Sequence, residues 1–211
     1  MTFDRVNPGE LDGARNAPHE REGDHHPVTL TLKAKQRKRR RRRAVGYVLV
    51  AAGWAASVGL STLIAPPPFL HAFALFVHLA SLIVGFGAVL MVEWYGLLWS
   101  TEWRSVRDLR QVDITLKPLI WAGLIGLLAS GAFLEPNLEA PLTLVKLGAV
   151  LVVSLNGVAL TQWTFYLARF PKQMRFAALP PRARFRFVAS AIISQLAWWT
   201  AVVIGMLNAA S

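Results

Sequence analysis

The sequence predicts an all-α protein, a polytopic membrane bundle of five transmembrane helices, and three observations lead to that prediction. First, 54% of the 211 residues are hydrophobic although the formal net charge is +11. Second, charge is concentrated in residues 1–43, which hold 12 of the 23 basic and six of the 12 acidic residues. Third, the rest of the chain alternates between long apolar runs and short connectors. Apolar runs of about 20 residues match the hydrocarbon thickness of a bilayer.

Residues 1–32 mix charged residues with Pro, Gly and Asn and show no apolar period. Such a composition buries too little surface to offset the entropy of ordering, so we predict a disordered cytoplasmic tail over 1–43. The first apolar run begins only after residue 43, too far into the chain for an ordinary signal peptide. We therefore expect no cleavage.

The predicted spans lie at about 44–65, 69–100, 118–134, 141–168 and 187–209. Their connectors indicate an orientation. Residues 101–117 carry four basic and three acidic residues, and residues 169–186 carry six basic and no acidic residues. The connector between the third and fourth spans carries only Glu135 and Glu139. Because Lys and Arg stay on the cytoplasmic side, we predict the N-terminus inside and the C-terminus outside the cell (cytoplasmic) membrane.

A basic run directly precedes the first span. It includes Lys38, Arg39, Arg40, Arg41, Arg42 and Arg43. A basic patch can neutralise nucleic-acid phosphates, but no stacking aromatic residues are interleaved with this one. Its position next to a span favours a topological anchor that attracts anionic lipid headgroups rather than a nucleic acid.

Ionisable residues within a span are costly, so each is treated as a candidate site. His78 lies in the apolar stretch ALFVHLASLIVGFG. Helical spacing places it on one face of the second span with small residues, and small residues let helices approach closely. The residues of this face are His71, Ala74, His78, Ser81, Gly85 and Gly96. A second small-residue face, formed by Gly123, Gly126 and Ser130, is predicted on the third span.

Lys146 enters the fourth span about five residues from its outer boundary, at the same depth as His78. The sequence thus predicts an outward-opening polar pocket formed from four of the spans. Its members are His71, His78, Lys146, Glu135 and Asn208. Each has a simpler interpretation: a histidine can pack through a hydrogen bond, a lysine can extend to the headgroups, and the other two can be solvated at the interface.

The residue inventory narrows the chemistry. The chain has no cysteine, which excludes disulfides, thiolate nucleophiles and cysteine-ligated metals. No phosphate-binding glycine loop, HExxH motif or paired carboxylates are present. His71 and His78 are two helical turns apart, about 10 Å along the axis, so they cannot bind one haem iron from opposite sides. A symmetric dimer could supply His78 twice.

Three segments carry a resemblance to known proteins: HLASLIVGFG at 78–87, VKLGAVLVVSLNG at 145–157 and SQLAWWTAVVIGMLN at 194–208. Together they resemble uncharacterised small multi-pass membrane proteins of actinobacterial type. A His early in one span and a Lys opening another are distantly similar to copper-resistance D-like proteins and small membrane protoporphyrinogen oxidases. The second resemblance implies porphyrin or haem b chemistry, with His78 and Lys146 at the matching positions. Asn156 stands where those oxidases usually carry a further histidine.

We therefore predict an integral cytoplasmic-membrane protein without an identifiable catalytic motif. Its predicted role is that of a subunit or binding protein that packs as a homo-oligomer or in a larger membrane complex. Two alternatives stay open. One is a haem- or porphyrin-linked redox protein that uses His78 and Lys146. The other is a small-solute or metal carrier that uses the outer pocket.

Overall fold

The structure is a computed structural model that describes residues 26–167, 170–171 and 173–210. These residues form five long helices and one 3₁₀ turn, with no strand among them, which confirms the predicted all-α bundle. The elements are α1 (His26–Ser61), α2 (Pro68–Ser100), α3 (Val106–Gly131), α4 (Pro141–Leu167), η3 (Phe176–Ala178) and α5 (Pro181–Ala210). Each long helix contains a segment that is long and apolar enough to cross a bilayer. The protein is thus a multi-pass membrane protein.

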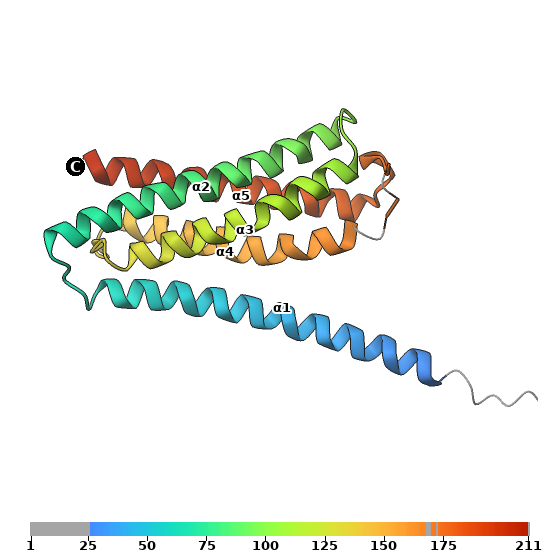
Figure 1. Ribbon diagram of the computed structural model, residues 1–211, viewed down its shortest axis with the longest axis horizontal. Helices are drawn as coiled ribbons and strands as arrows, with labels where there is room; N and C mark the ends of the chain where they lie inside the picture. The colour runs from blue at the N-terminus through green and yellow to red at the C-terminus, as the bar shows by residue number, and fades with distance from the viewer. Residues whose placement is uncertain (1–25, 168–169, 172, 211) are drawn as a thin grey trace, which may run out of the picture. The chain divides into compact units, whose positions relative to one another are not determined.

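The four helices from α2 to α5 alternate in direction (Figure 1). The connectors that follow α2 and α4 therefore lie at the same end of this bundle, which we call the basic end. Among the residues described there, the exposed basic ones are Arg104, Arg107, Arg175, Arg182 and Arg186. The connector between α3 and α4, which carries Glu135 and Glu139, lies at the opposite end.

Proline marks where several helices begin. Pro68 is the first residue of α2, and Pro141 and Pro181 open α4 and α5. The first turn of a helix suits proline because its missing N–H has no intrahelical acceptor there and its φ angle is already helical. α5 consequently starts six residues before the predicted span.

The third helix differs most from its predicted boundaries of 118–134. α3 begins twelve residues earlier because Ser105 and Asp108 form a capping box. The Ser105 Oγ accepts a hydrogen bond from the Asp108 N–H at 3.3 Å, and the Ser105 N–H donates to Asp108 Oδ2 at 3.1 Å. These bonds satisfy backbone groups that a helix start leaves unpaired. Pro118 lies inside α3 rather than at its beginning.

The first helix also departs from the prediction. Residues 26–43, predicted as part of a disordered tail, belong to α1, and residues 1–25 of that tail lie outside the described residues. Lys and Arg have high helix propensity, and helix formation is cooperative, so the helical span can propagate back through the basic run. The basic run is therefore the N-terminal continuation of a membrane-spanning helix.

The bundle consists of two closely packed helix pairs, α2 with α3 and α4 with α5, and α3 meets α4 less extensively. The predicted small-residue faces form the first pair, because a Cβ added to Gly123 would lie 2.4 Å from the Cα of Gly85. Two side chains of α1 reach the other helices. Ser57 Oγ donates to the Leu128 carbonyl of α3 at 2.5 Å, and Trp54 Nε1 donates to the Leu147 carbonyl of α4 at 3.0 Å.

Two apolar clusters fill the bundle at different depths. The middle cluster comprises Val89, Leu124, Leu127, Ala149, Val153, Ala197 and Trp198. The basic-end cluster comprises Trp99, Val106, Leu109, Leu167 and Leu179. Trp99 is only 1% exposed, and its Nε1 donates to the Met174 carbonyl at 2.9 Å. This bond fixes the connector between α4 and α5 to the end of α2.

Candidate binding cavity

His78, the central residue of the predicted outer pocket, faces α3. Its Nδ1 lies 2.9 Å from Ser130 Oγ, and Ser130 Oγ donates its own hydrogen to the Gly126 carbonyl at 2.6 Å. Because a hydroxyl has one hydrogen, Ser130 accepts from His78, which places the imidazole proton on Nδ1. The histidine is thus a hydrogen-bonded member of the packed α2–α3 face.

The other predicted pocket residues are only partly brought together. Lys146 is half-buried on α4. Asn208 Nδ2 donates to the buried Thr143 Oγ1 at 3.3 Å, which joins α5 to α4. His71 is half-buried near the start of α2, and Glu135 is exposed in the connector with a φ of 43°. Binding at this outer pocket stays a prediction.

The side chain of Asn156 forms its hydrogen bonds with α5 and not with the predicted outer pocket around Lys146. Its Nδ2 donates to the Ser190 carbonyl at 2.9 Å, and its Oδ1 accepts from Ser190 Oγ at 2.6 Å. Both ends of the amide are therefore used in joining α4 to α5, and the side chain also lines the cavity described next.

A cavity of about 110 Å³ lies between α2, α3, α4 and α5, and residues of both apolar clusters line it. It therefore occupies the level between the middle of the bundle and the basic end. Four charged side chains contribute to its wall: Glu93 from α2, with Arg110, Asp113 and Lys117 from α3. Aromatic side chains of Trp121, Trp163, Phe187 and Trp198 cover much of the remaining wall.

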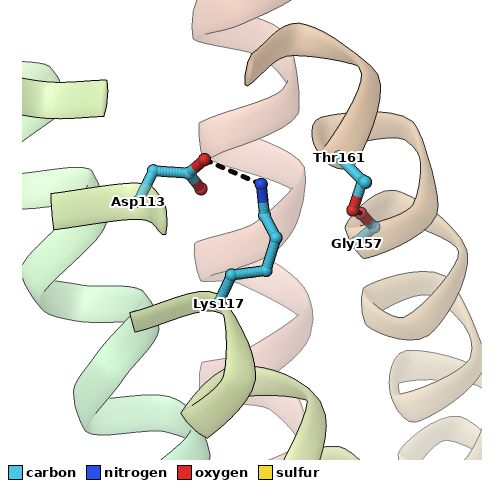
Figure 2. Close-up of polar contacts among 4 residues, drawn as sticks. All are labelled: Asp113, Lys117, Gly157 and Thr161. Atoms are coloured by element: carbon cyan, nitrogen blue, oxygen red, sulfur yellow. Dashed lines mark hydrogen bonds and ion pairs between the residues drawn. The ribbon is translucent and has the colours of Figure 1, made fainter. Parts of the chain in front are cut away.

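Asp113 and Lys117 form an ion pair one helical turn apart on α3. The Lys117 Nζ lies 2.7 Å from Asp113 Oδ2, and the two side chains are 25% and 18% exposed. Figure 2 shows the pair on α3 opposite Gly157 and Thr161 of α4. Thr161 Oγ1 donates to the Gly157 carbonyl of its own helix at 3.0 Å. The partly exposed ion pair thus forms part of the cavity wall on α3, opposite α4.

Glu93 is anchored through one oxygen only. Its Oε2 accepts a hydrogen bond from Gln195 Nε2 of α5, and Gln195 Oε1 in turn accepts from Trp199 Nε1 at 3.0 Å. The second oxygen, Oε1, is buried and has no hydrogen-bond partner among the residues that the structure describes. One acceptor in this wall is therefore unsatisfied.

Arg110 carries an unsatisfied hydrogen-bond donor, whereas Glu93 carries an unsatisfied acceptor. Its Nε is buried and likewise has no hydrogen-bond partner within the described part of the chain. A buried polar group without a partner costs about 1–3 kcal/mol. Two such atoms of opposite hydrogen-bonding character, in the wall of one cavity, indicate a place where a bound molecule can supply both missing partners.

The sequence did contain a signal for this site. Taking Pro118 as the start of the third span left Arg110, Asp113 and Lys117 in a connector. The serine and aspartate of SVRD at 105–108 have the spacing of a capping box, which would have placed the helix start ahead of all three charges. Helical spacing alone places Glu93 at the margin of the packed α2 face.

Within the described residues, no group of three or more His, Asp or Glu side chains is arranged to hold a metal ion. Comparisons with known proteins gave no match to any protein-family model, curated protein or solved structure.

Proposed function

We propose that the protein is a membrane-embedded binding protein whose cavity holds the polar part of an amphiphilic molecule. The observation that carries this proposal is the pair of unpartnered buried atoms, Glu93 Oε1 and Arg110 Nε, in the wall of one cavity. The rest of the wall is mostly apolar, with Trp121 and Trp198 beside the polar groups. Mainly apolar pockets with a few placed polar groups are typical of small-molecule sites.

The size of the cavity supports a polar group with a few carbon atoms. A water molecule requires about 10–15 Å³ of such space, so about 110 Å³ is room for more than one water and less than a whole lipid. The acidic residue Glu93 lies well inside its helix. Glu93 precedes the end of α2 by seven residues, about 10 Å along the axis.

The orientation is part of the same proposal. Lys and Arg are retained on the cytoplasmic side of membrane proteins, and the described part of the basic end carries five exposed arginines. In this orientation the cavity lies in the cytoplasmic half of the bilayer, closer to the cytoplasm than His78 is.

The proposal is tested by the molecules that the full-length protein retains. The chain is purified in a neutral detergent, denatured, and its extract analysed by mass spectrometry. We expect one amphiphile at close to one molecule per chain. Arg110→Gln should lose it, while the control Arg107→Gln, which alters an exposed arginine on the same helix, should retain it.

Thermal unfolding of both variants shows whether the fold is kept. Absence of any retained molecule in the native protein contradicts the proposal. Equal retention by a folded Arg110→Gln variant contradicts it as well.

The haem- or porphyrin-linked alternative stays a prediction with its own test. Because Nδ1 of His78 is bonded to Ser130, Nε2 is the atom that would face an iron. A Soret band that disappears in His78→Ala supports this alternative, and a colourless preparation contradicts it. Assembly with partner chains or as a homo-oligomer also stays a prediction.

A further inference from the structure

Among the described residues, the charged side chains that line the cavity are two acidic and two basic, and this balance restricts the ligand. Asp113 and Lys117 pair with each other, so their charges largely cancel. Glu93 and Arg110 remain, one acidic and one basic, each with an unpartnered buried atom. A ligand with a net charge would leave one uncompensated charge in a medium of low dielectric constant, which is costly. A ligand that carries both charges and is neutral overall avoids that cost.

The two atoms also specify the groups of the ligand. The guanidinium of Arg110 is planar and matches phosphate oxygens better than any other side chain. Glu93 Oε1 accepts a hydrogen bond and therefore requires a donor. A primary ammonium supplies three N–H donors, whereas a quaternary ammonium supplies none. The fitting headgroup is a phosphate joined to a primary amine.

The surroundings favour a lipid as the source of this headgroup. The cavity is enclosed by segments of four membrane-spanning helices and capped on both sides by apolar clusters. Asp113 and Lys117 of α3 line the cavity opposite α4, as Figure 2 shows, and their side chains are 18% and 25% exposed, so this part of the wall is reached from outside. Ile114, on the same helix, is 58% exposed. A lipid whose headgroup occupies the cavity can therefore place its acyl chains along the apolar outer surface of the bundle.

We propose that the cavity binds the headgroup of an aminophospholipid from the surrounding bilayer, with the phosphate at Arg110 and the primary ammonium at Glu93. This inference rests on the proposed function and names its ligand class.

The test uses full-length protein in nanodiscs of phosphatidylcholine that contain equal minor fractions of phosphatidylethanolamine and phosphatidylglycerol. The protein is re-extracted with detergent, and the lipid that remains bound is quantified by mass spectrometry. Phosphatidylcholine lacks the N–H donor, and phosphatidylglycerol lacks the positive charge. We expect phosphatidylethanolamine to be enriched about tenfold over both, which corresponds to about 1.4 kcal/mol. Equal retention of phosphatidylglycerol overturns the assignment.

Variants separate the two contacts. Arg110→Gln should reduce the retention of phosphatidylethanolamine and phosphatidylglycerol alike. Glu93→Gln should remove only the preference for phosphatidylethanolamine. The matched controls are Arg107→Gln and Glu139→Gln, which alter exposed side chains outside the cavity. A preference that survives in a folded Glu93→Gln variant overturns the ammonium contact and with it the proposal.

Free phosphoethanolamine distinguishes the membrane from a water-soluble source. It is added to the loaded protein at the same concentration as the lipid, and we expect it to leave the bound lipid in place. Displacement at that concentration overturns the lipid assignment. Retention of a different amphiphile that depends on Arg110 overturns this inference and leaves the proposed function standing. Retention of nothing that depends on Arg110 overturns both.

Discussion

Gly85 and Gly123 approach so closely that the bundle has no room for a methyl group between them. A Cβ on Gly123 would lie 2.4 Å from the Gly85 Cα and 2.7 Å from the Ser81 carbonyl oxygen, both backbone atoms. We expect Gly123→Ala to lower the free energy of unfolding by about 1–3 kcal/mol, the usual cost of overpacking. Denaturant-induced unfolding in detergent micelles, followed by tryptophan fluorescence, measures this change.

Gly148 is the matched control for that substitution. It lies on α4, and a Cβ built there has nothing within 4 Å. Gly148→Ala should be neutral or slightly stabilising, since alanine favours a helix over glycine by about 1 kcal/mol. Equal stability of the two alanine variants would contradict the close α2–α3 contact.

The bond between His78 and Ser130 should contribute measurably to the same interface. It joins α2 to α3 at 2.9 Å, and hydrogen bonds between membrane helices are worth about 0.6–2 kcal/mol. A double-mutant cycle of His78→Ala and Ser130→Ala isolates that energy. We expect a coupling within this range, and additive effects of the two substitutions would show that the bond contributes nothing.

Two contacts hold the connector before α5, and we expect them to differ in strength. Trp99→Phe removes the buried bond to the Met174 carbonyl and should cost about 1–3 kcal/mol. Arg175→Gln removes the ion pair with Glu102, whose side chains are 74% and 38% exposed, and should cost less than about 1 kcal/mol. Thermal unfolding of the two variants compares them. A larger loss of stability in Arg175→Gln than in Trp99→Phe would contradict this expectation.

The orientation can be read with single cysteines because the chain contains none of its own. Glu139→Cys places a thiol in the connector opposite the basic end, and Arg104→Cys places one at the basic end; both positions are exposed. In intact cells, a membrane-impermeant maleimide should label the first variant and reach the second only after permeabilisation. The reverse pattern would invert the topology and move the cavity to the other half of the bilayer.

Helix periodicity was sufficient to predict which residues form the packed faces of α2 and α3, but not that these two faces meet. His78, Ser81 and Gly85 share one face by their spacing alone, and that face meets Gly123, Gly126 and Ser130 in the structure. Spacing predicts such a face because every residue of a regular helix has a fixed angular position. The small side chains on both helices then indicate which faces can come close.

The cavity could not be predicted in the same way. Three of its charged residues, Arg110, Asp113 and Lys117, fall in a polar stretch before Pro118, where a capping box is a weaker signal than a proline. Whether Glu93 and Arg110 share one cavity depends on how two helix pairs stand against each other, and no residue spacing within one helix contains that information. The unpartnered atoms are visible only once all four helices are in place.

Pro118 gives α3 a joint directly beside the ion pair. Proline has no N–H, so the carbonyl of Ile114 lacks its regular intrahelical donor, and helices bend most easily at such points. The segment before the joint carries Arg110, Asp113 and Lys117 together. A rotation of that segment about Pro118 would widen the cavity between α3 and α4. The rest of α3, which is packed against α2 through Gly123, would stay in place.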